Sequence, residues 1–510
     1  MNIHVDYRAS LSLVGTVLKY IAVALVFPIT VAVFYRESVI PFVTTILIAV
    51  LIGTALEHLD PDPDLGHREG FLLIGLTWLA VPFLGTLPYL IAGEGAVAQP
   101  ANALFESMSG FTTTGATVLG DISFETHSHS MLMWRQLTQW LGGMGIIVLM
   151  VAILPQLSVG GAQLVRHEAP GFGIDKLKPH ISETARALWM IYFGFTAVVC
   201  LLYYGLHLVG LAPQMDLYNA VAHALTTLPT GGFSPEARSV EAFSPAIQWI
   251  AMPSMIIAGT NFALLWYAIR GQPRRLLTNS EFRLYLGAMG VLGAFIGLLL
   301  FVDVGLVQSP AEVPMIPGDA EHSLRQALFQ VVAIVTTTGY ASMDFNTWSP
   351  ITQTLLLFAM FLGGSAGSAA GSIKIVRWYV IGRSAKRELF NTVHPEAIQP
   401  IRMGGRVLDE STIRGIFVLA FSFFVIFAIS TVVLFLDATQ TGMSLTTLEA
   451  MSAAMATLGN IGPGFGAVGP MDSYLSFSTP AKLYMVFLMW IGRLEILSVV
   501  VLLTPSYWRS

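Results

Sequence analysis

The chain has 510 residues, of which 54% are apolar and 11% are charged. Because charged residues make up about 25% of soluble proteins, this composition excludes an ordinary soluble protein, and the long apolar runs predict a polytopic membrane protein. The net charge is −5, and the single cysteine, Cys200, excludes an intramolecular disulfide and a cysteine metal site. We expect Cys200 to be a small buried residue of a span.

The first two apolar stretches, 11–34 and 38–57, predict a helical hairpin of two membrane spans. The first stretch is too long for the core of a signal peptide and lacks a small-residue cleavage pattern. The link that follows, 57–64, is acidic and spaced by prolines. Since the prolines forbid the flanking helices of a calcium loop, a solvated linker is the better interpretation.

The rest of the chain predicts four units with one plan, in which a span is followed by a short helix, a Thr-Gly loop and another span. A short helix of about 11 residues covers only about 16 Å, half of a bilayer, as a re-entrant pore helix does. The expected segments are 71–92, 101–112 and 131–154; 187–211, 216–228 and 245–269; 284–305, 322–335 and 351–381; and 411–436, 445–456 and 480–503. With the hairpin they give ten crossings, an all-α fold, and divisions 1–60, 61–160, 161–275, 276–390 and 391–510.

The four Thr-Gly loops are the strongest sign of internal repetition. If their glycines are equivalent, the separations are 117, 107 and 120 residues for Gly115, Gly232, Gly339 and Gly459. A dehydrated monovalent cation needs oxygen ligands, which rings of backbone carbonyls supply. Glycine allows the required dihedrals and a close approach of the main chain. Four such loops around one axis predict a cation filter.

The distribution of charge predicts the orientation. Lysine and arginine gather in three links, 155–186, 270–283 and 374–414, whereas the opposite links are rich in acids. Because basic links belong in the cytoplasm, both termini are expected inside and the filter loops open outward. The acidic rim would raise the local concentration of cations, although ordinary solvation of a surface explains the same acids.

With the loops placed, the sequence resembles the Trk/Ktr/HKT superfamily of potassium transporters, most closely its Trk-type (TrkH-like) branch. The resemblance rests on the four loops, on the leading hairpin, and on motifs at 140–145, 363–374 and 491–495. It implies a pseudo-fourfold pore, a homodimer, and a cytosolic TrkA-like nucleotide-binding ring that regulates it. It also implies potassium uptake across the inner (cytoplasmic) membrane, with no organic cofactor and no nucleic acid bound by this chain.

The resemblance also implies which residues line the ion path. Carried over to this chain, the potassium-binding filter positions are Thr113, Thr114, Gly115, Thr230, Gly231, Gly232, Thr337, Thr338, Gly339, Thr457, Leu458 and Gly459. The second loop is ambiguous by one residue, and we align it on Gly232. Sodium-selective plant members of the superfamily have serine in place of the first glycine, so Gly115 favours potassium. A sodium-permeable member, or a cotransporter coupled to Na⁺ or H⁺, is the alternative.

Two features beneath the filter predict control of the pore. Residues 363–372 are only Gly, Ser and Ala, followed by a lysine. Close helix packing is one interpretation; the resemblance implies a gate loop with Gly363, Gly364, Gly367, Gly371 and Lys374. Arg493 lies in an otherwise apolar span, where a charge costs about 2.5 to 3.5 kcal/mol, and the resemblance places it in the ion path as an electrostatic barrier. Glu495, two residues on, cannot share its helix face.

The remaining polar residues favour structural roles. Glu106, His223, Gln330 and Glu449 lie within the short helices and are expected to anchor them, or to attract ions. His127 and His129 lie on an outer link without matching metal ligands. The sequence has no nucleophile elbow, His-Glu-x-x-His motif, Walker loop or paired intramembrane acids, so an enzyme is not expected.

Overall fold

The structure, a computed structural model, describes residues 5–60, 66–148, 181–307, 316–404 and 406–508. Within these ranges it is helical apart from short connections and one antiparallel pair of strands, β1 (Arg402–Met403) and β2 (Arg406–Val407). The expected basic link 155–186 lies mostly outside the described residues. So do the end of the expected span 131–154, most of the acidic link after residue 60, and the acidic residue Glu312.

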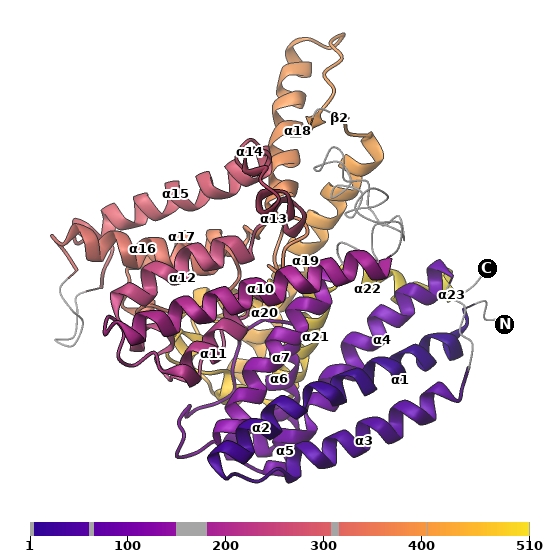
Figure 1. Cartoon of the computed structure of the whole chain (residues 1–510). Helices are drawn as coiled ribbons and strands as arrows, with labels where there is room; N and C mark the ends of the chain where they lie inside the picture. The colour runs from indigo at the N-terminus through magenta and orange to yellow at the C-terminus, as the bar shows by residue number, and fades with distance from the viewer. Residues whose placement is uncertain (1–4, 61–65, 149–180, 308–315, 405, 509–510) are drawn as a thin grey trace.

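The N-terminal hairpin consists of α1 (Tyr7–Ala24), α2 (Val26–Tyr35) and α3 (Ile40–Glu57). Helices α1 and α3 cross at glycines, because a Cβ on Gly53 would lie 2.7 Å from the carbonyl oxygen of Gly15. Beside this crossing Lys19 of α1 forms an ion pair with Glu57 of α3. Figure 1 shows α1 between α3 and α4. The hairpin therefore flanks α4, the first helix after it.

The four units follow the hairpin in the order that the sequence predicts. The first holds α4 (His67–Gly85), α5 (Leu87–Ala92), α6 (Pro100–Phe111) and α7 (His129–Val148); the second α10 (Ile181–Leu208), α11 (Leu217–Thr227), α12 (Pro245–Ala258) and α13 (Phe262–Ile269). The third holds α15 (Ser280–Phe301), α16 (Ala320–Val335), α17 (Pro350–Met360) and α18 (Ile375–Val393), and α14 (Pro273–Leu277) precedes it. The fourth holds α19 (Glu410–Thr441), α20 (Thr447–Leu458), α21 (Thr479–Arg493), α22 (Leu497–Leu503) and α23 (Pro505–Trp508).

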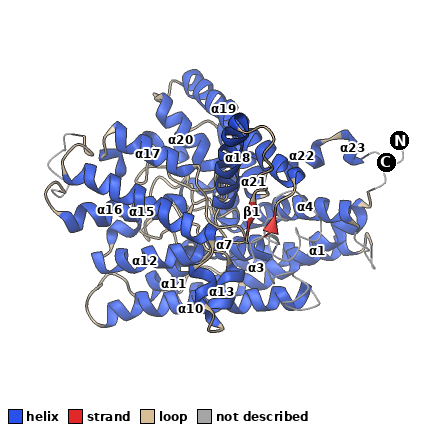
Figure 2. Ribbon diagram, turned by 90° about the horizontal axis from the view of Figure 1, so that it is seen from above, coloured by secondary structure: helices blue, strands red, loops and turns tan. Residues whose placement is uncertain are grey.

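Short 3-10 turns lie in the links next to the four short helices, before the first of them and after the other three. They are Gly95–Ala98, Ser239–Ala242, Phe345–Thr347, Gly466–Val468 and Tyr474–Ser476. In the view from above, loop segments gather in the middle of the molecule with helices around them (Figure 2). The loops after the short helices are thus enclosed by the rest of the protein, where irregular backbone is tolerated inside a membrane.

Three of the predicted spans are interrupted. Helices α12 and α13 bend by 107° at the Gly259–Asn261 break, where the side chain of Asn261 accepts a hydrogen bond from the amide of Ala263 at 2.8 Å and caps α13. Helices α17 and α18 are separated by residues 361–374, and α21 and α22 by residues 494–496. The expected spans 245–269 and 480–503 are therefore wrong as single helices, whereas the interruption of 351–381 contains the segment 363–372, for which the resemblance implies a loop.

Membrane crossing is supported by length and composition. Six helices or joined helices among the described residues are long and apolar enough to span a bilayer, or seven if the bent pair counts as one span. They are Tyr7–Tyr35, Ile40–Glu57, Arg68–Ala92, Ala185–Leu208, Ser280–Phe301 and Glu410–Thr441, with the bent pair Pro245–Ala258 and Phe262–Ile269. The expected total of ten crossings and the expected division of the chain at 60, 160, 275 and 390 stay predictions.

Two further features describe the outline of the molecule. Helix α18 and the start of α19 project away from the remaining helices, with the two-stranded sheet between them (Figure 1). The two ends of the chain lie near each other in the same view. There the Tyr507 hydroxyl donates to the carbonyl of Arg68 at 2.5 Å, and Tyr507 packs with Val5 and Leu72.

Candidate functional site

The four loops after the short helices begin with the same hydrogen bond. In each, the amide of one loop residue donates to the carbonyl five residues back, inside the preceding helix. The four pairs are Thr114 to Ser109 at 2.8 Å, Gly231 to Thr226 at 2.9 Å, Thr338 to Ala333 at 2.8 Å and Ile461 to Ala456 at 2.9 Å. This repeated bond sets which residues of the four loops are equivalent.

The backbone then follows the same alternation in all four loops. The residue before the bonded amide has a positive φ, namely Thr113 (51°), Thr230 (54°), Thr337 (55°) and Asn460 (53°). The residue after it has a positive φ again, namely Gly115 (81°), Gly232 (76°), Gly339 (74°) and Gly462 (104°). Left-handed backbone is rare for a β-branched residue such as threonine, and such strain persists only where the surroundings impose it.

The fourth loop corrects the expected register by three residues. Thr457 and Leu458 are the last residues of α20, and Gly459 is its C-cap with a φ of −82°. The positions equivalent to Thr113, Thr114 and Gly115 are instead Asn460, Ile461 and Gly462. The Ala-Thr-Leu-Gly sequence is similar to that of the other loops. The loop, however, starts only where helix α20 ends. In the second loop Gly232, not Gly231, occupies the glycine position.

At the four glycines each loop contacts the next one, in cyclic order. A Cβ on any of them would collide with a carbonyl oxygen of the next loop: Gly115 with Gly231, Gly232 with Thr338, Gly339 with Ile461, and Gly462 with Thr114. Each obstacle is a backbone atom, which cannot rotate away as a side chain can. Only glycine fits at these four positions, and the fourth loop closes on the first.

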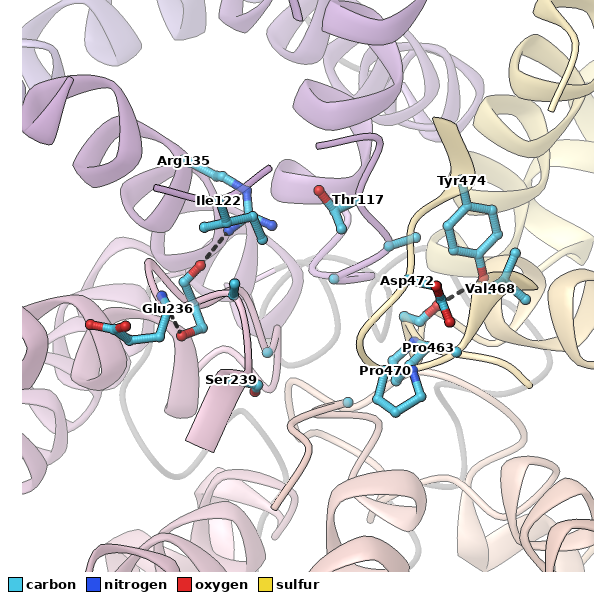
Figure 3. A pocket seen from close by; sticks show the side chains of 18 residues that line it. Thr117, Ile122, Arg135, Glu236, Ser239, Pro463, Val468, Pro470, Asp472 and Tyr474 are labelled. Atoms are coloured by element: carbon cyan, nitrogen blue, oxygen red, sulfur yellow. Dashed lines mark hydrogen bonds between the residues drawn. The ribbon is translucent and has the colours of Figure 1, made fainter. Parts of the chain in front are cut away.

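All four glycines face one pocket, which Figure 3 shows from close by. Thr117, Glu236, Asp472 and Tyr474 are among its other lining residues. The Tyr474 hydroxyl donates to the carbonyl of Gly462 at 2.9 Å and so holds the fourth loop at the pocket wall. The pocket therefore opens onto the ring of glycine–carbonyl contacts.

The first loop is anchored by the buried carboxylate of Glu106 in α6. It accepts from the hydroxyl of Thr117 at 2.9 Å, from the amide of Val118 at 2.9 Å and from Nε of Arg135 at 2.6 Å. Both partners of the ion pair are almost completely buried. Breaking such a pair by removing one partner typically costs about 3–5 kcal/mol. The pair therefore holds the segment just after Gly115 in place.

Arg135 of α7 extends this anchor to the second loop. Its Nη1 donates to the carbonyl of Ser234 at 2.9 Å, and its guanidinium lies 3.5 Å from the centre of the Phe233 ring. Gln139, one helical turn further along α7, donates to the carbonyl of Gly231 at 2.7 Å and accepts from the amide of Phe233 at 3.1 Å. No local pattern in the sequence marks Arg135 or Gln139 for this role.

The other loops have comparable anchors in their short helices. Nε2 of His223 lies 3.0 Å from Oγ of Ser234, and Nε2 of Gln330 donates to Oγ of Ser342 at 3.1 Å. These contacts agree with the anchoring role expected for Glu106, His223 and Gln330. In the fourth unit the anchor is Ser452, whose hydroxyl accepts from the amide of Phe465 at 2.9 Å. Glu449, expected in this role, forms the N-terminal capping box of α20 with Thr446.

The Gly-rich segment lies directly against these loops. It forms an irregular loop between α17 and α18, closed at its base by a hydrogen bond of 2.8 Å from the amide of Gly363 to the carbonyl of Ile373. The amide of Gly371 donates to Oγ1 of Thr337 in the third loop at 2.7 Å. A Cβ on Gly371 would also collide with the carbonyl oxygen of Gly459. The segment therefore contacts the third and fourth loops.

The same segment also contacts the break between α12 and α13. The amide of Ser365 donates to the carbonyl of Gly259 at 2.9 Å, and the amide of Phe262 donates to the carbonyl of Gly367 at 3.2 Å. A Cβ on Gly364 would lie 2.7 Å from the same Gly259 oxygen. Main-chain contacts on several sides explain why the segment is built from the smallest residues.

Two buried cations hold carbonyl groups of this segment. Nζ of Lys374 donates to the carbonyl of Ala370 and lies 3.5 Å from that of Ser368. Nη1 of Arg493, at the end of α21, donates to the carbonyl of Ala369 at 2.7 Å. Arg493 is only 3% exposed, and its Nε and Nη2 have no hydrogen-bond partner among the described residues. The guanidinium thus lies beside the segment beneath the loops.

Glu495 does not pair with Arg493, as its spacing predicts. Its carboxylate forms an ion pair of 2.5 Å with Nη2 of Arg377 in α18, so the end of α21 and the break that follows it each contact the third unit through a charged residue. At the end of the molecule that holds α2, His129 stacks on Tyr35 and Phe124, with Nδ1 2.9 Å from Glu37. Among the described residues no group of three or more His, Cys, Asp and Glu could hold a metal ion.

Comparisons with known proteins agree with this geometry. The profile of a family described as TrkH, cation transport protein, matches residues 39–510. The chain is 37% identical to the Trk system potassium uptake protein TrkH of Vibrio parahaemolyticus over 513 residues, covering 99% of this chain and 100% of that protein. It is 35% identical to the Escherichia coli protein of the same name over 510 residues, with the same coverage. The crystal structure of the potassium transporter TrkH from Vibrio parahaemolyticus superposes with a TM-score of 0.84 at 34% identity, covering 99% of this chain and 100% of that one.

Proposed function

The chain belongs to the TrkH family of cation transport proteins, and on this basis we propose that it takes up potassium ions across the cytoplasmic membrane. Curated relatives that match almost its whole length are named as Trk system potassium uptake proteins. Its long apolar helices suit a multi-pass membrane protein. In this proposal both termini lie in the cytoplasm, because the links 270–283 and 374–414 are basic.

The selectivity filter of this proposal is the ring of four loops, arranged with pseudo-fourfold symmetry around the ion path. The observation that carries it is the cyclic set of contacts in which each glycine abuts the carbonyl of the next loop. Backbone carbonyls that replace a hydration shell must converge on one axis, and four equivalent loops closed into a ring provide that. The filter residues are Thr113, Thr114, Gly115, Thr230, Gly231, Gly232, Thr337, Thr338, Gly339, Asn460, Ile461 and Gly462.

The Gly-rich segment acts in this proposal as a gate beneath the filter, with Arg493 as a barrier beside it. The supporting contacts are the hydrogen bonds from Gly371 to Thr337 and from Arg493 to Ala369. Only a few side chains hold the segment in place. A small movement of Lys374 or Arg493 would therefore release several of its carbonyl groups. The gate therefore has a physical basis in contacts that can exchange with water or ions.

Regulation is proposed to come from a cytosolic TrkA-like nucleotide-binding ring that acts on a homodimer of this chain. The projecting helix α18 carries Arg383, Lys386 and Arg387 on the side assigned to the cytoplasm. It continues directly from the Gly-rich segment through Lys374. A partner that moves α18 would therefore move the gate.

The test is rubidium uptake into vesicles that carry the purified chain, with potassium and sodium as competitors. We expect potassium to compete well and sodium poorly. Gly115→Ser should weaken this preference, because its side chain would meet the carbonyl of Gly231. Gly120→Ser is the matched control, since a Cβ there lies 3.0 Å from the flexible end of Leu475, outside the ring. Equal competition by sodium and potassium in the unmodified chain would reject potassium selectivity.

A further inference from the structure

An apolar pocket lies between the N-terminal hairpin and the first pore unit. Its cavity volume is about 230 Å³, more than the roughly 150 Å³ of an apolar cavity that takes up benzene. Helices α1, α4 and α7, with the last residue of α6, supply its walls. The lining residues are Val17, Ile21, Leu73, Ile74, Thr77, Trp78, Val81, Pro82, Phe111, Leu141, Gly142 and Gly145. No charged residue is among them.

The chemistry of the walls decides what can occupy the pocket. Oγ1 of Thr77 is the one side-chain hydroxyl of the lining, and it has no hydrogen-bond partner among the described residues. A buried water needs about two to four polar partners, and apolar cavities stay dry. An empty cavity is unfavourable as well, because the atoms that line it lose packing contacts. A flexible hydrocarbon satisfies these walls.

The surroundings supply that hydrocarbon. The segments that contain α1 and α4, Tyr7–Tyr35 and Arg68–Ala92, are long and apolar enough to span a bilayer. The pocket is lined by the middle part of both helices, which is the depth of the hydrocarbon core in a bilayer-spanning segment. We propose that one acyl chain of a membrane phospholipid occupies this pocket and supports the first filter loop from behind.

The pocket reaches the loop through Phe111. This residue ends α6 immediately before Thr112–Gly115, and its ring is part of the pocket wall. Behind its backbone, a Cβ on Gly142 would collide with the carbonyl oxygen of Phe111. The end of α6 is thus held between α7 and the pocket occupant. An acyl chain there limits how far Phe111 can move away from the ring.

The pocket also reaches Arg493 through Trp78. The indole is one wall of the pocket, and the Arg493 guanidinium lies 5.9 Å from the centre of its ring. An occupant that fixes Trp78 therefore fixes one side of the guanidinium beneath the loops. The acyl chain would influence the filter and the proposed barrier together. This inference does not depend on which ion passes, so it can hold even if potassium selectivity fails.

The direct test is quenching of Trp78 fluorescence by phosphatidylcholine with brominated acyl chains. The signal of Trp78 is the difference between the unmodified chain and Trp78→Phe, both reconstituted in the same vesicles. We expect this difference to be strongly quenched. Gly145→Phe should abolish the quenching, because Gly145 faces the pocket and a Cβ there lies 3.6 Å from Trp78, with room beyond it. Each variant is paired with its own Trp78→Phe background.

The matched control is Gly287→Phe, another glycine of a membrane-spanning helix, with nothing within 4 Å of its Cβ. It should leave the quenching of Trp78 unchanged. A brominated free fatty acid, added to vesicles of ordinary phospholipid, should quench far less than the brominated phospholipid. If the fatty acid quenches as strongly, the proposed source is wrong. Quenching of Trp78 that persists in folded Gly145→Phe would overturn the pocket assignment.

A second measurement needs no substitution. A phospholipid with a photoactivatable group at the end of its acyl chain can be cross-linked to the unmodified chain in vesicles. We expect adducts on peptides that carry Trp78 and Leu141. Adducts confined to outward-facing residues such as Phe193 and Leu201, which are 63% and 69% exposed, would overturn the proposal.

Uptake should also differ between vesicles of linear and methyl-branched lipids, and this difference should vanish in Gly145→Phe.

Discussion

Asn460 in the fourth loop donates a hydrogen bond of 2.9 Å from Nδ2 to Oγ1 of Thr114 in the first loop, 346 residues away. The same amide group lies 3.0 Å from the carbonyl of Met489 in α21. Asn460 therefore closes the ring of loops and ties it to the helix that ends in Arg493. It occupies the left-handed position that the other loops fill with threonine, and asparagine visits that conformation more readily than other residues with a side chain.

We predict that Asn460→Ala loosens the closure of the ring. The change removes two hydrogen bonds, each worth about 1 kcal/mol, and places alanine in a left-handed conformation that costs about 1–2 kcal/mol. Thermal unfolding in detergent should occur at a lower temperature, and rubidium uptake should become less selective against sodium. Asn460→Thr should be milder, since threonine occupies the equivalent position in three loops. An Ala variant as stable and selective as the unmodified chain would contradict the role of this residue.

The corrected register of the fourth loop gives a second prediction from a pair of neighbouring glycines. Gly462→Ala should impair selectivity and uptake, because Gly462 has a φ of 104° and its Cβ would lie 2.7 Å from the carbonyl oxygen of Thr114. Gly459→Ala should be tolerated better, because Gly459 has a φ of −82° and its Cβ meets only the preceding turn of its own helix and a side chain: it lies 2.9 Å from both the mobile methyl end and the carbonyl oxygen of Met455, and 3.1 Å from the Ile461 side chain. Uptake per folded molecule compares the two. Greater damage from the Gly459 variant would restore the original register.

The difference between these glycines shows what sequence could and could not predict. The repeated Thr-Gly strings predict four loops, and apolar periodicity places the short helices before them to within a few residues. The fourth loop fails because Thr457 and Leu458 are still helical, and letters alone do not reveal where a helix ends. Asn460 is the sign of the correct register in the sequence. It lies two residues before a glycine, with the same spacing as Thr113 and Gly115.

The broken spans were harder to predict for a related reason. An apolar run of sufficient length predicts a continuous helix, and the breaks at Gly259–Asn261 and at residues 494–496 are only three residues long. Tertiary contacts from the Gly-rich segment make the first break favourable, through the bond from Ser365 to Gly259. Anchors such as Ser452 and Gln139 were missed because their partners are distant backbone groups, which no local pattern encodes.

We predict that Arg493→Gln raises the rate of cation passage. At 4 Å two unit charges interact by about 4 kcal/mol at an effective dielectric constant of 20, and by about 1 kcal/mol in water. Removing such a barrier corresponds to roughly tenfold faster passage or more. Arg493→Lys should stay close to the unmodified rate because it keeps the charge. Uptake per folded molecule measures both variants. A well-folded Gln variant with no faster uptake would contradict the barrier hypothesis.

Shortening the Gly-rich segment should leave a leaky pore. Deletion of residues 366–370 removes the carbonyls of Ser368, Ala369 and Ala370, which Lys374 and Arg493 hold. Uptake should rise and depend less on the regulatory partner, because the obstruction beneath the loops is smaller. Rubidium uptake with and without the partner measures this, with gel filtration to show that the variant is folded. Regulation equal to that of the unmodified chain would mean that the segment only packs.

Acid should reduce uptake through Asp472, which lines the pocket above the glycines. Partial burial, together with the negative charge of Asp344, raises the pKa of Asp472 above its ordinary value. As pH falls through this raised pKa, the carboxylate becomes neutral and attracts fewer cations. The same protonation stabilises the folded state, because a raised pKa means that the folded protein binds the proton more tightly. Uptake and stability should therefore move in opposite directions.

The measurement is the initial rate of uptake at low potassium concentration as pH is lowered from about 6 to about 4. This range extends upward from the ordinary pKa of aspartate. Asp472→Asn should give a low rate that varies less with pH. Thermal unfolding at each pH separates this effect from acid denaturation. A variant with the same pH profile as the unmodified chain would assign the loss of uptake to other groups.

The cyclic order of the loops has a consequence for biosynthesis. Three of its four contacts join successive units, so they can form as each unit leaves the ribosome and enters the bilayer. The last one, between Gly462 and Thr114, must wait until nearly the whole chain has been translated, and contacts of such high sequence separation form late. An incomplete chain therefore holds an open arc of loops rather than the closed ring of the proposed filter. In that proposal the membrane would meet a conducting path only once the final unit has joined the first, so completion of synthesis would itself guard against leakage.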